Sequence, residues 1–361
     1  MWDLAVREED YEGADSMMRR MTAPPLSMRI LLTFVRGDSA ARARIVEEAR
    51  AADSRQSQIA ARWVATFLED FATAKSLAEL DLAPRRKPPI RANAQLFLAW
   101  LEVAAGRWTA AKAAFAQAER MDEAPPVLVQ RAIAATLPFL AVPRRDLDSL
   151  RREVELWNPA AEVSEPGAGL ALRLQPHLRL YLLGLLSSRL GDHAGALRIV
   201  REIERADGPD DARAVIRALA LTIRADVALQ SRSAEQAGRA LEAVQGEVPL
   251  ELVSVPLYAN VREFTQEHAR HLRVLALSAQ QKYREALQWI ETSFQGAPSE
   301  IVYLAPMHLE QAEIYERLGE REKAVEHYRR FLVLWRDCDP ELRPVLERAK
   351  SELARMVAEP R

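Results

Sequence analysis

The sequence predicts an all-α protein built from pairs of antiparallel helices that stack as a solenoid. Three observations support this fold class. Apolar residues recur at spacings of three and four over stretches of about 12 to 16 residues. Segments that alternate with period two are rare, and the helical stretches come in pairs separated by Gly, Pro or Asp. Because each pair would expose an apolar face alone, neighbouring pairs must cover one another.

The clearest pair runs from Gln95 to Ala118. Its first helix is expected to end at Gly106, which can adopt the left-handed conformation of an inter-helix turn. Trp108 follows as an aromatic wedge. Ala111 is small where two helices must approach closely, and Phe115 continues the buried face one turn later.

This order of small residue, glycine, aromatic, alanine and aromatic resembles the tetratricopeptide repeat (TPR) family. The frame recurs with its small residue at Ala196, Ala237, Ala286 and Ala324. These alanines are about 38 to 49 residues apart, whereas the family repeat is about 34, so longer helices or inserted turns are expected. The resemblance implies an α-α superhelix. We expect about nine helix pairs, followed by a polar capping helix over Glu341–Val357.

The chain is expected to divide at one linker. Residues 1–158 are predicted to form divergent N-terminal helix pairs, residues 159–169 a Pro- and Gly-rich linker or hinge, and residues 170–361 the C-terminal array with its capping helix. The segment Glu9–Tyr11 already has the composition of an inter-helix turn, so the first helix looks like the second half of a longer one. We therefore interpret the chain as the C-terminal part of a larger architecture.

The C-terminal third carries a second resemblance. The segments Ile301–Pro306, Ala312–Gly319 and His327–Leu342 are similar to the repeat tails of bacterial serine/threonine protein kinases and large transcriptional activators. This resemblance implies a regulatory or sensor module. The sequence has no glycine-rich phosphate loop, no His-Arg-Asp triplet and no Asp-Phe-Gly, so any kinase activity is expected in a different polypeptide.

Composition narrows the class of partner. The 361 residues are 49% hydrophobic and 28% charged with a net charge of −2, which gives no long-range field favouring nucleic acid or acidic membranes. Basic residues are mostly arginine, which is typical of a GC-rich bacterial genome. The single cysteine, Cys338, fits a reducing cytoplasm and excludes an internal disulfide. No apolar run is long enough to span a membrane.

Three short patterns resemble chemical sites. His268 and His271 share a helical face and could bind a metal, but no third ligand is evident, so we interpret them as groove or surface imidazoles. Gly167-Ala168-Gly169 follows no strand and is interpreted as linker rather than phosphate loop. The basic cluster Arg85, Arg86, Lys87 and Arg91 is interpreted as a solvated turn rather than a phosphate contact.

The expected site is a concave wall. By resemblance, the first helix of each pair would line a groove for a protein or peptide ligand, with aromatic and arginine side chains as hot spots. Carrying the family's groove positions across by sequence gives Trp100, Tyr181, Arg189, Asp226, Gln230, His268, His271, Glu313 and Arg317.

The sequence thus predicts a cytoplasmic, non-catalytic scaffold for protein–protein interaction. No cofactor, metal or catalytic residue is expected, because no cluster of acid, base and nucleophile stands out. The alternative is the regulatory repeat module of a kinase or transcriptional activator system, with such a protein as partner. An enzyme on a helical solenoid is the third hypothesis. The partner, the pathway and the oligomeric state are not specified by the sequence, although a helix with exposed Trp2 and Tyr11 is the first candidate surface for self-association.

Overall fold

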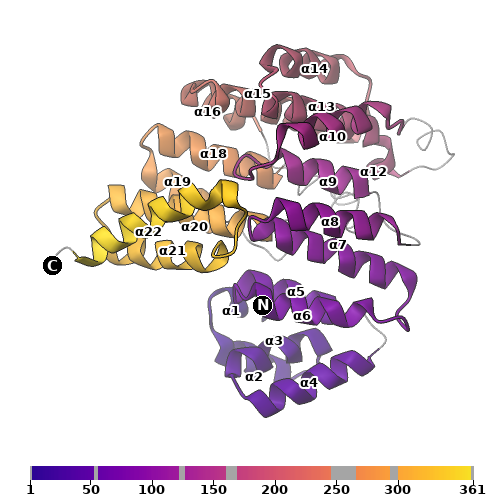
Figure 1. Cartoon of the computed structure of the whole chain (residues 1–361), viewed down its shortest axis with the longest axis vertical. Coiled ribbons are helices and arrows are strands. Elements are labelled where there is room, and N and C mark those ends of the chain that lie inside the picture. Colours follow the sequence, from indigo (N-terminus) through magenta and orange to yellow (C-terminus); the bar gives the residue numbers. More distant parts are fainter. Residues whose placement is uncertain are drawn as a thin grey trace. The chain divides into compact units, whose positions relative to one another are not determined.

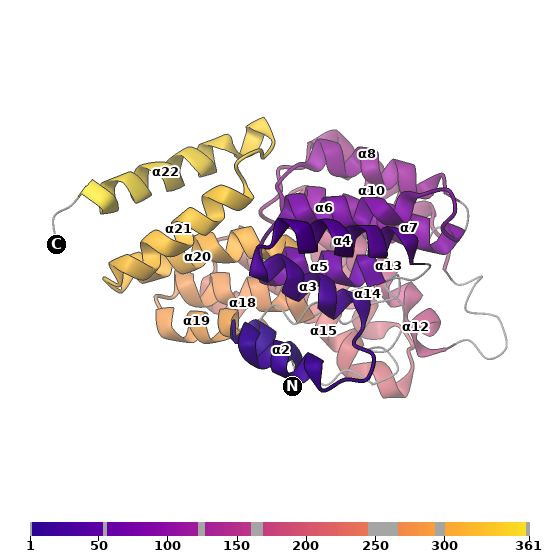
Figure 2. The ribbon, with the colours of Figure 1, turned by 90° about the horizontal axis from the view of Figure 1, so that it is seen from below.

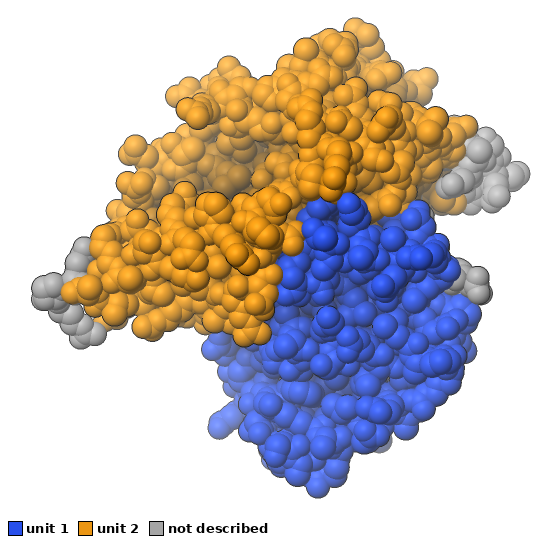
Figure 3. Space-filling model, viewed as in Figure 1, with its two compact units in different colours: residues 1–127, 294–304 blue, residues 128–293, 305–361 orange. Residues whose placement is uncertain are grey.

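The computed structural model describes residues 2–52, 56–121, 127–159, 169–244, 266–292 and 300–358, and every element in these ranges is helical. The all-α class is confirmed, whereas the superhelical solenoid stays a prediction. The chain forms two compact units (Figure 3). Unit 1 holds Met1–Val127 and Phe294–Leu304, and unit 2 holds Leu128–Ser293 and Ala305–Arg361. Residues 160–168 of the expected hinge lie outside the described ranges, so that division is not tested.

Unit 1 is a series of helix pairs (Figure 1). The first helix packs on the second within α1–α2, α3–α4, α5–α6 and α7–α8, while α3 packs on α5 and α6 on α7. The elements of unit 1 are α1 (Trp2–Arg7), α2 (Tyr11–Arg19), α3 (Leu26–Arg36), α4 (Ser39–Ala51), α5 (Gln56–Phe67), α6 (Phe71–Glu79), η1 (Leu80–Leu82), α7 (Pro88–Ala104), α8 (Trp108–Glu119) and η4 (Ile301–Tyr303).

Aromatic side chains fill the core of unit 1. Trp100 on α7 packs edge-to-face on Phe115 of α8, with ring centroids 5.9 Å apart. Trp2 is buried, and its ring centroid lies 5.1 Å from that of Trp63 on α5. The expectation of an exposed Trp2 is therefore wrong: burial against Trp63 removes this residue from any surface for self-association.

The basic cluster after η1 is not simply a solvated turn, because Arg86 is buried. Its Nε lies 3.1 Å from Oδ1 of the fully buried Asp81, and its Nη2 donates to the carbonyl of Ala49 at 2.9 Å. Ser57 on α5 donates to the other oxygen of Asp81 at 2.8 Å. Arg85 and Lys87 are exposed, as expected. The correction follows from Asp81, five residues upstream, whose burial requires a cationic partner.

Unit 2 continues the pairing of antiparallel helices. Within it α13 packs on α14, α15 on α16, α18 on α19 and α21 on α22, and α10 packs on α13 (Figure 1, Figure 2). The elements are α9 (Val127–Thr136), α10 (Arg144–Leu156), α12 (Leu170–Arg173), α13 (Gln175–Arg189), α14 (His193–Arg205), η2 (Asp210–Ala212), α15 (Arg213–Gln230), α16 (Ala234–Glu242), α18 (His268–Ala279), α19 (Tyr283–Glu291), α20 (Leu304–Arg317), α21 (Arg321–Leu334), η5 (Pro340–Leu342) and α22 (Arg343–Ala358).

One turn geometry recurs between paired helices. A backbone N–H reaches back five residues to a carbonyl of the first helix, and the residue before this N–H has a positive φ. Gly106, Gly191 and Gly319 take this position, as their sequence context predicts. The hydrogen bonds are Asp10 to Ala5, Arg107 to Glu102, Asp192 to Ser187, Ser233 to Ala228, Lys282 to Leu277 and Glu320 to Tyr315, at 2.8 to 2.9 Å.

Successive pairs approach closely in unit 2 where small residues permit it. Gly184 on α13 lies against Ile223 of α15, so that an added Cβ would meet Ile223 Cδ1 at 2.5 Å. Ala225, Ala237 and Ala276 belong to one buried cluster that joins α15, α16 and α18. The predicted capping helix is α22, which ends at Ala358. Among the described helices, none is long and apolar enough to cross a membrane.

Candidate functional site

The nine residues predicted to face a partner fall into two groups by accessibility. Trp100, Tyr181, Asp226, His268 and His271 are buried. Arg189 and Glu313 are half-buried, and Gln230 and Arg317 are exposed. Because a buried side chain offers no surface to a partner, the first five do not contribute to an exposed binding wall in this structure. For the other four the contact role stays a prediction.

Five of these residues meet in what we call the inner polar cluster of unit 2. The cluster comprises Ser188, Arg189, Asp226, Gln230, His268 and His271, carried by α13, α15 and α18. The carboxylate of Asp226 accepts hydrogen bonds from Ser188 Oγ at 2.5 Å and from Gln230 Nε2 at 2.8 Å. Arg189 donates to the carbonyl of Leu140 at 2.8 Å and to that of Pro138 at 3.3 Å.

Burial controls the charges of the inner polar cluster. It raises the pKa of Asp226, while hydrogen bonds from Ser188 and Gln230 and the charge of Arg189 act in the opposite direction. Burial and the positive charge of Arg189 lower the pKa of His268 to about 4. Burial and His268 lower the pKa of His271 to about 3. Both imidazoles are therefore neutral at pH 7.

The contacts of the inner polar cluster do not form a nucleophile–base pair. Ser188 is fully buried, and its hydroxyl donates to Asp226 and accepts from Gln230 at 2.8 Å. The nearby ring of His193 lies 3.3 Å from Gln230 Oε1 and 3.4 Å from Ser231 Oγ. The hydrogen bonds of Ser188 are therefore made with an acid and an amide, and not with this histidine. Within the described ranges, no three His, Cys, Asp or Glu side chains are placed to hold a metal ion. The cluster ties three helices together.

Of the remaining predicted residues, Glu313 has an ion-pair partner, Tyr181 is buried and Arg317 is exposed. Glu313 on α20 pairs with Arg348 of α22 at 3.0 Å, and burial raises the pKa of Glu313. Tyr181 is among the largest fully buried side chains of the protein. Cys338 is buried, and its burial raises the pKa of the thiol, which opposes formation of the reactive thiolate.

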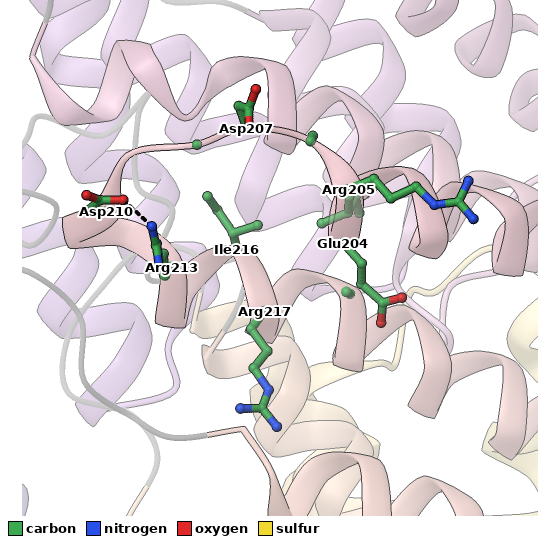
Figure 4. Close-up of a pocket in the computed structure, with 11 residues that line it drawn as sticks. Glu204, Arg205, Asp207, Asp210, Arg213, Ile216 and Arg217 are labelled. Carbon is green, nitrogen blue, oxygen red and sulfur yellow. Dashed lines mark hydrogen bonds and ion pairs between the residues drawn. The ribbon is translucent and has the colours of Figure 1, made fainter.

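A surface pocket of about 540 Å³ lies between the last turn of α14, the segment 206–209 and the first half of α15, and we call it the α14–α15 pocket (Figure 4). Ile203, Ile216 and Ala220 give it a buried apolar floor. Gly208 packs closely against this floor. A Cβ added to Gly208 would lie 2.4 Å from Ile216 Cδ1 and 3.0 Å from His177 Cε1. The segment 206–209 is thus seated directly on buried side chains, which fixes one wall of the pocket.

The rim of the α14–α15 pocket is charged. Arg213 pairs with Asp210 at 2.6 Å, and Glu204 pairs at 2.8 Å with Arg224, which lies further along α15. Arg205 and Arg217, both exposed, line the same pocket. Among the described residues neither of these two arginines has an ion-pair partner. The pocket therefore combines an apolar floor with a rim of three arginines and three acidic side chains, on which Arg205 and Arg217 have no ion pair among the described residues.

This pocket was not predicted from the sequence, because one of its walls depends on the tertiary contact of Gly208 with Ile216 and His177. The signal was present in the spacing. Ile216 and Ala220 are four residues apart on α15, as are Arg213 and Arg217, so an apolar row and a cationic row lie beside each other on one helix.

A second pocket, of about 820 Å³, lies between the start of α21 and the end of α22. Lys323 on its rim pairs with Glu320 at 2.8 Å, and Arg321 donates to the carbonyl of Met356. Val357, which also lines it, is 57% exposed. Two of its three cations are thus engaged, whereas Arg329 has no ion pair among the described residues. The partly exposed apolar lining makes this pocket the weaker candidate.

A scan against protein-family models finds no match for this chain, and a search of the curated proteins finds no relative.

Proposed function

We propose that this chain is a non-catalytic protein-interaction module that holds a segment of a partner protein on its helical framework. One observation carries the proposal: the α14–α15 pocket pairs a buried apolar floor with two exposed arginines that have no acidic partner among the described residues. Desolvated apolar contacts and arginine are the groups that dominate binding energy at protein interfaces. Packed helices also lose little entropy when a ligand binds.

The proposal includes a TPR-like arrangement of the helix pairs. The recurrent five-residue turn hydrogen bond, at Asp192, Ser233 and Lys282 among others, supports a common geometry for successive pairs. The scarcity of cysteine supports a cytoplasmic location. A regulatory module of a kinase or transcriptional activator is the second form of the same proposal, and the identity of the partner decides between them.

The test is quantitative affinity capture of the intact chain from its native host. The wild-type chain is compared with the double variant Arg205→Glu/Arg217→Glu and with Arg201→Glu, an exposed arginine on α14 outside the pocket. We expect a specific partner that the double variant loses and the control keeps. A kinase or transcriptional regulator as this partner would favour the regulatory form.

Two results would count against the proposal. A wild-type chain that retains no protein above background would remove the interaction function. Equal recovery of one partner by all three chains would place the docking site away from the α14–α15 pocket. Far-ultraviolet circular dichroism of each variant checks that the helices are intact.

A further inference from the structure

We infer that the α14–α15 pocket recognises an acidic segment of a partner protein that also carries an aliphatic side chain, with a carboxylate on Arg217 and the aliphatic group on the floor at Ile216 and Ala220. The inference rests on the proposed function and names the chemistry of its ligand. It differs from the groove predicted by sequence, since no residue of that predicted set lines this pocket.

The apolar part of the ligand is specified by the floor. Ile203, Ile216 and Ala220 are at most 9% exposed, yet they line an open pocket. The space of about 540 Å³ is large enough for one or two side chains of an extended segment. Covering this floor with a leucine or isoleucine removes apolar surface from water, which stabilises the complex.

The charged part of the ligand is specified by the arginines of α15. Arg213, Arg217 and Arg224 follow one another along the helix at spacings of four and seven residues. The outer two are held by acids, Arg213 by Asp210 at 2.6 Å and Arg224 by Glu204 at 2.8 Å. Arg217 stands between them and has no ion pair among the residues described. A carboxylate brought by a ligand would complete the row with a charge-assisted hydrogen bond.

The two sides of the pocket differ in charge. Figure 4 shows Asp207 on one side of Ile216 and Arg217 on the other, each side chain directed away from the floor. A carboxylate is therefore favoured beside Arg217 and disfavoured beside Asp207, which can accept N–H groups of the ligand. This polarity favours one direction of a bound segment.

A protein segment fits this rim better than a nucleic acid does. Phosphate backbones are bound by continuous positive surfaces. Here Glu204, Asp207 and Asp210 alternate with the arginines, and the net charge of the chain is −2. The buried aliphatic floor also has no counterpart in a phosphate contact.

The experiment uses the full chain and defined probes. A short fluorescein-labelled peptide of alternating glutamate and leucine is titrated by fluorescence anisotropy, alongside the same peptide with glutamine in place of glutamate and a labelled DNA duplex. We expect saturable binding of the glutamate peptide that weakens as salt is added. Arg217→Glu should weaken it at least about tenfold, since one charge-assisted hydrogen bond is replaced by repulsion.

The matched control is Arg201→Glu, which makes the same change of charge on an exposed residue outside the pocket, and its affinity should stay within about twofold of wild type. Equal binding of the glutamine peptide would overturn the role of the carboxylate. Tighter binding of the duplex, or equal losses in both variants, would overturn the inference as a whole. If the peptides fail while affinity capture still yields a partner, the inference falls and the interaction function stands.

Discussion

Buried polar side chains in this protein are compensated by named partners, and each compensation has an energetic consequence. In unit 1, Asp81 and Arg86 form an ion pair whose side chains are 0% and 1% exposed. In unit 2, Asp226 is surrounded by Ser188 and Gln230 rather than by solvent. Such groups are costly to bury alone, so removing one partner should affect stability far more than removing an exposed charge.

Arg86→Ala should lower the free energy of unfolding by about 3 to 5 kcal/mol, because it leaves the buried carboxylate of Asp81 without its cation. Arg85→Ala, one residue away and exposed, should change it by no more than about 0.5 kcal/mol. Chemical denaturation of the two variants measures the difference. Equal stabilities would show that the ion pair does not anchor the segment after η1.

The two buried histidines should make stability depend on pH. The folded pKa is about 4 for His268 and about 3 for His271, below the unfolded value of about 6.5. Since the folded pKa is depressed, the stabilisation is fully present above pH 6.5 and is lost as the pH falls towards the folded values. Asp226 acts oppositely, because its raised pKa gives stability that is lost as pH rises through the folded value.

The measurement is the slope of the unfolding free energy against pH from pH 6.5, near the unfolded pKa of histidine, down to about pH 4.5, just above the folded pKa of His268. His268→Gln/His271→Gln should make this slope less positive. It leaves the contribution of His177, whose pKa is also lowered by burial, and the opposing contribution of buried acids such as Glu310, whose pKa burial raises to about 7. The slope is the diagnostic quantity, because the substitutions can also change stability at neutral pH. A slope equal to that of the wild type would show that neither imidazole is held neutral in the folded protein.

At the scale of the element, the inter-helix turns show how far the sequence determines local structure. Gly106 is predicted from the sequence to form such a turn, and Gly106, Gly191 and Gly319 each have a positive φ. At the equivalent positions Glu9, Arg232 and Gln281 also have positive φ, although they carry a Cβ that disfavours it. The turn is thus imposed by packing of the two helices, which a propensity argument does not include.

The candidate site also shows which features can be predicted from the sequence and which cannot. The resemblance to the tetratricopeptide family predicts that Arg189, Asp226 and His268 share one wall, and the structure brings them together. Their burial could not be predicted from the sequence, because burial depends on which elements pack against a helix face. The α14–α15 pocket depends on how Gly208 seats against Ile216, a tertiary contact that periodicity does not reveal.

Equivalent turn positions should respond to substitution with opposite signs. Gly191→Ala should destabilise by about 1 kcal/mol, since its φ of 82° disfavours a Cβ while no neighbouring atom lies within 4 Å. Gln281→Gly should stabilise the protein by roughly 0.5 kcal/mol. It removes the Cβ that is strained at a φ of 61°, and this gain exceeds the cost of the greater backbone entropy that glycine has in the unfolded chain. Thermal unfolding checks both. The same sign for the two variants would mean that side-chain contacts, and not the backbone, dominate these turns.

At the scale of the whole molecule, the two compact units are not consecutive segments of the chain. Unit 1 consists of the first 127 residues together with residues 294–304, which follow most of unit 2 in the sequence. Within unit 1, η4 packs against α7, and its Ile301, Val302 and Tyr303 are buried. The core of unit 1 is therefore completed only after residue 300 has been reached.

This arrangement predicts that a substitution far downstream weakens the N-terminal helices. Ile301→Ala should destabilise unit 1 by about 2 to 5 kcal/mol through the lost side chain and the cavity it leaves. Hydrogen exchange followed by mass spectrometry should then show faster exchange of the amides of α7, because exchange reports the local free energy of opening. Val333→Ala on α21, where the valine is 60% exposed, is the matched control and should leave α7 unchanged. Faster exchange confined to α20 and α21, with α7 protected as in the wild type, would contradict the assignment of η4 to the core of unit 1.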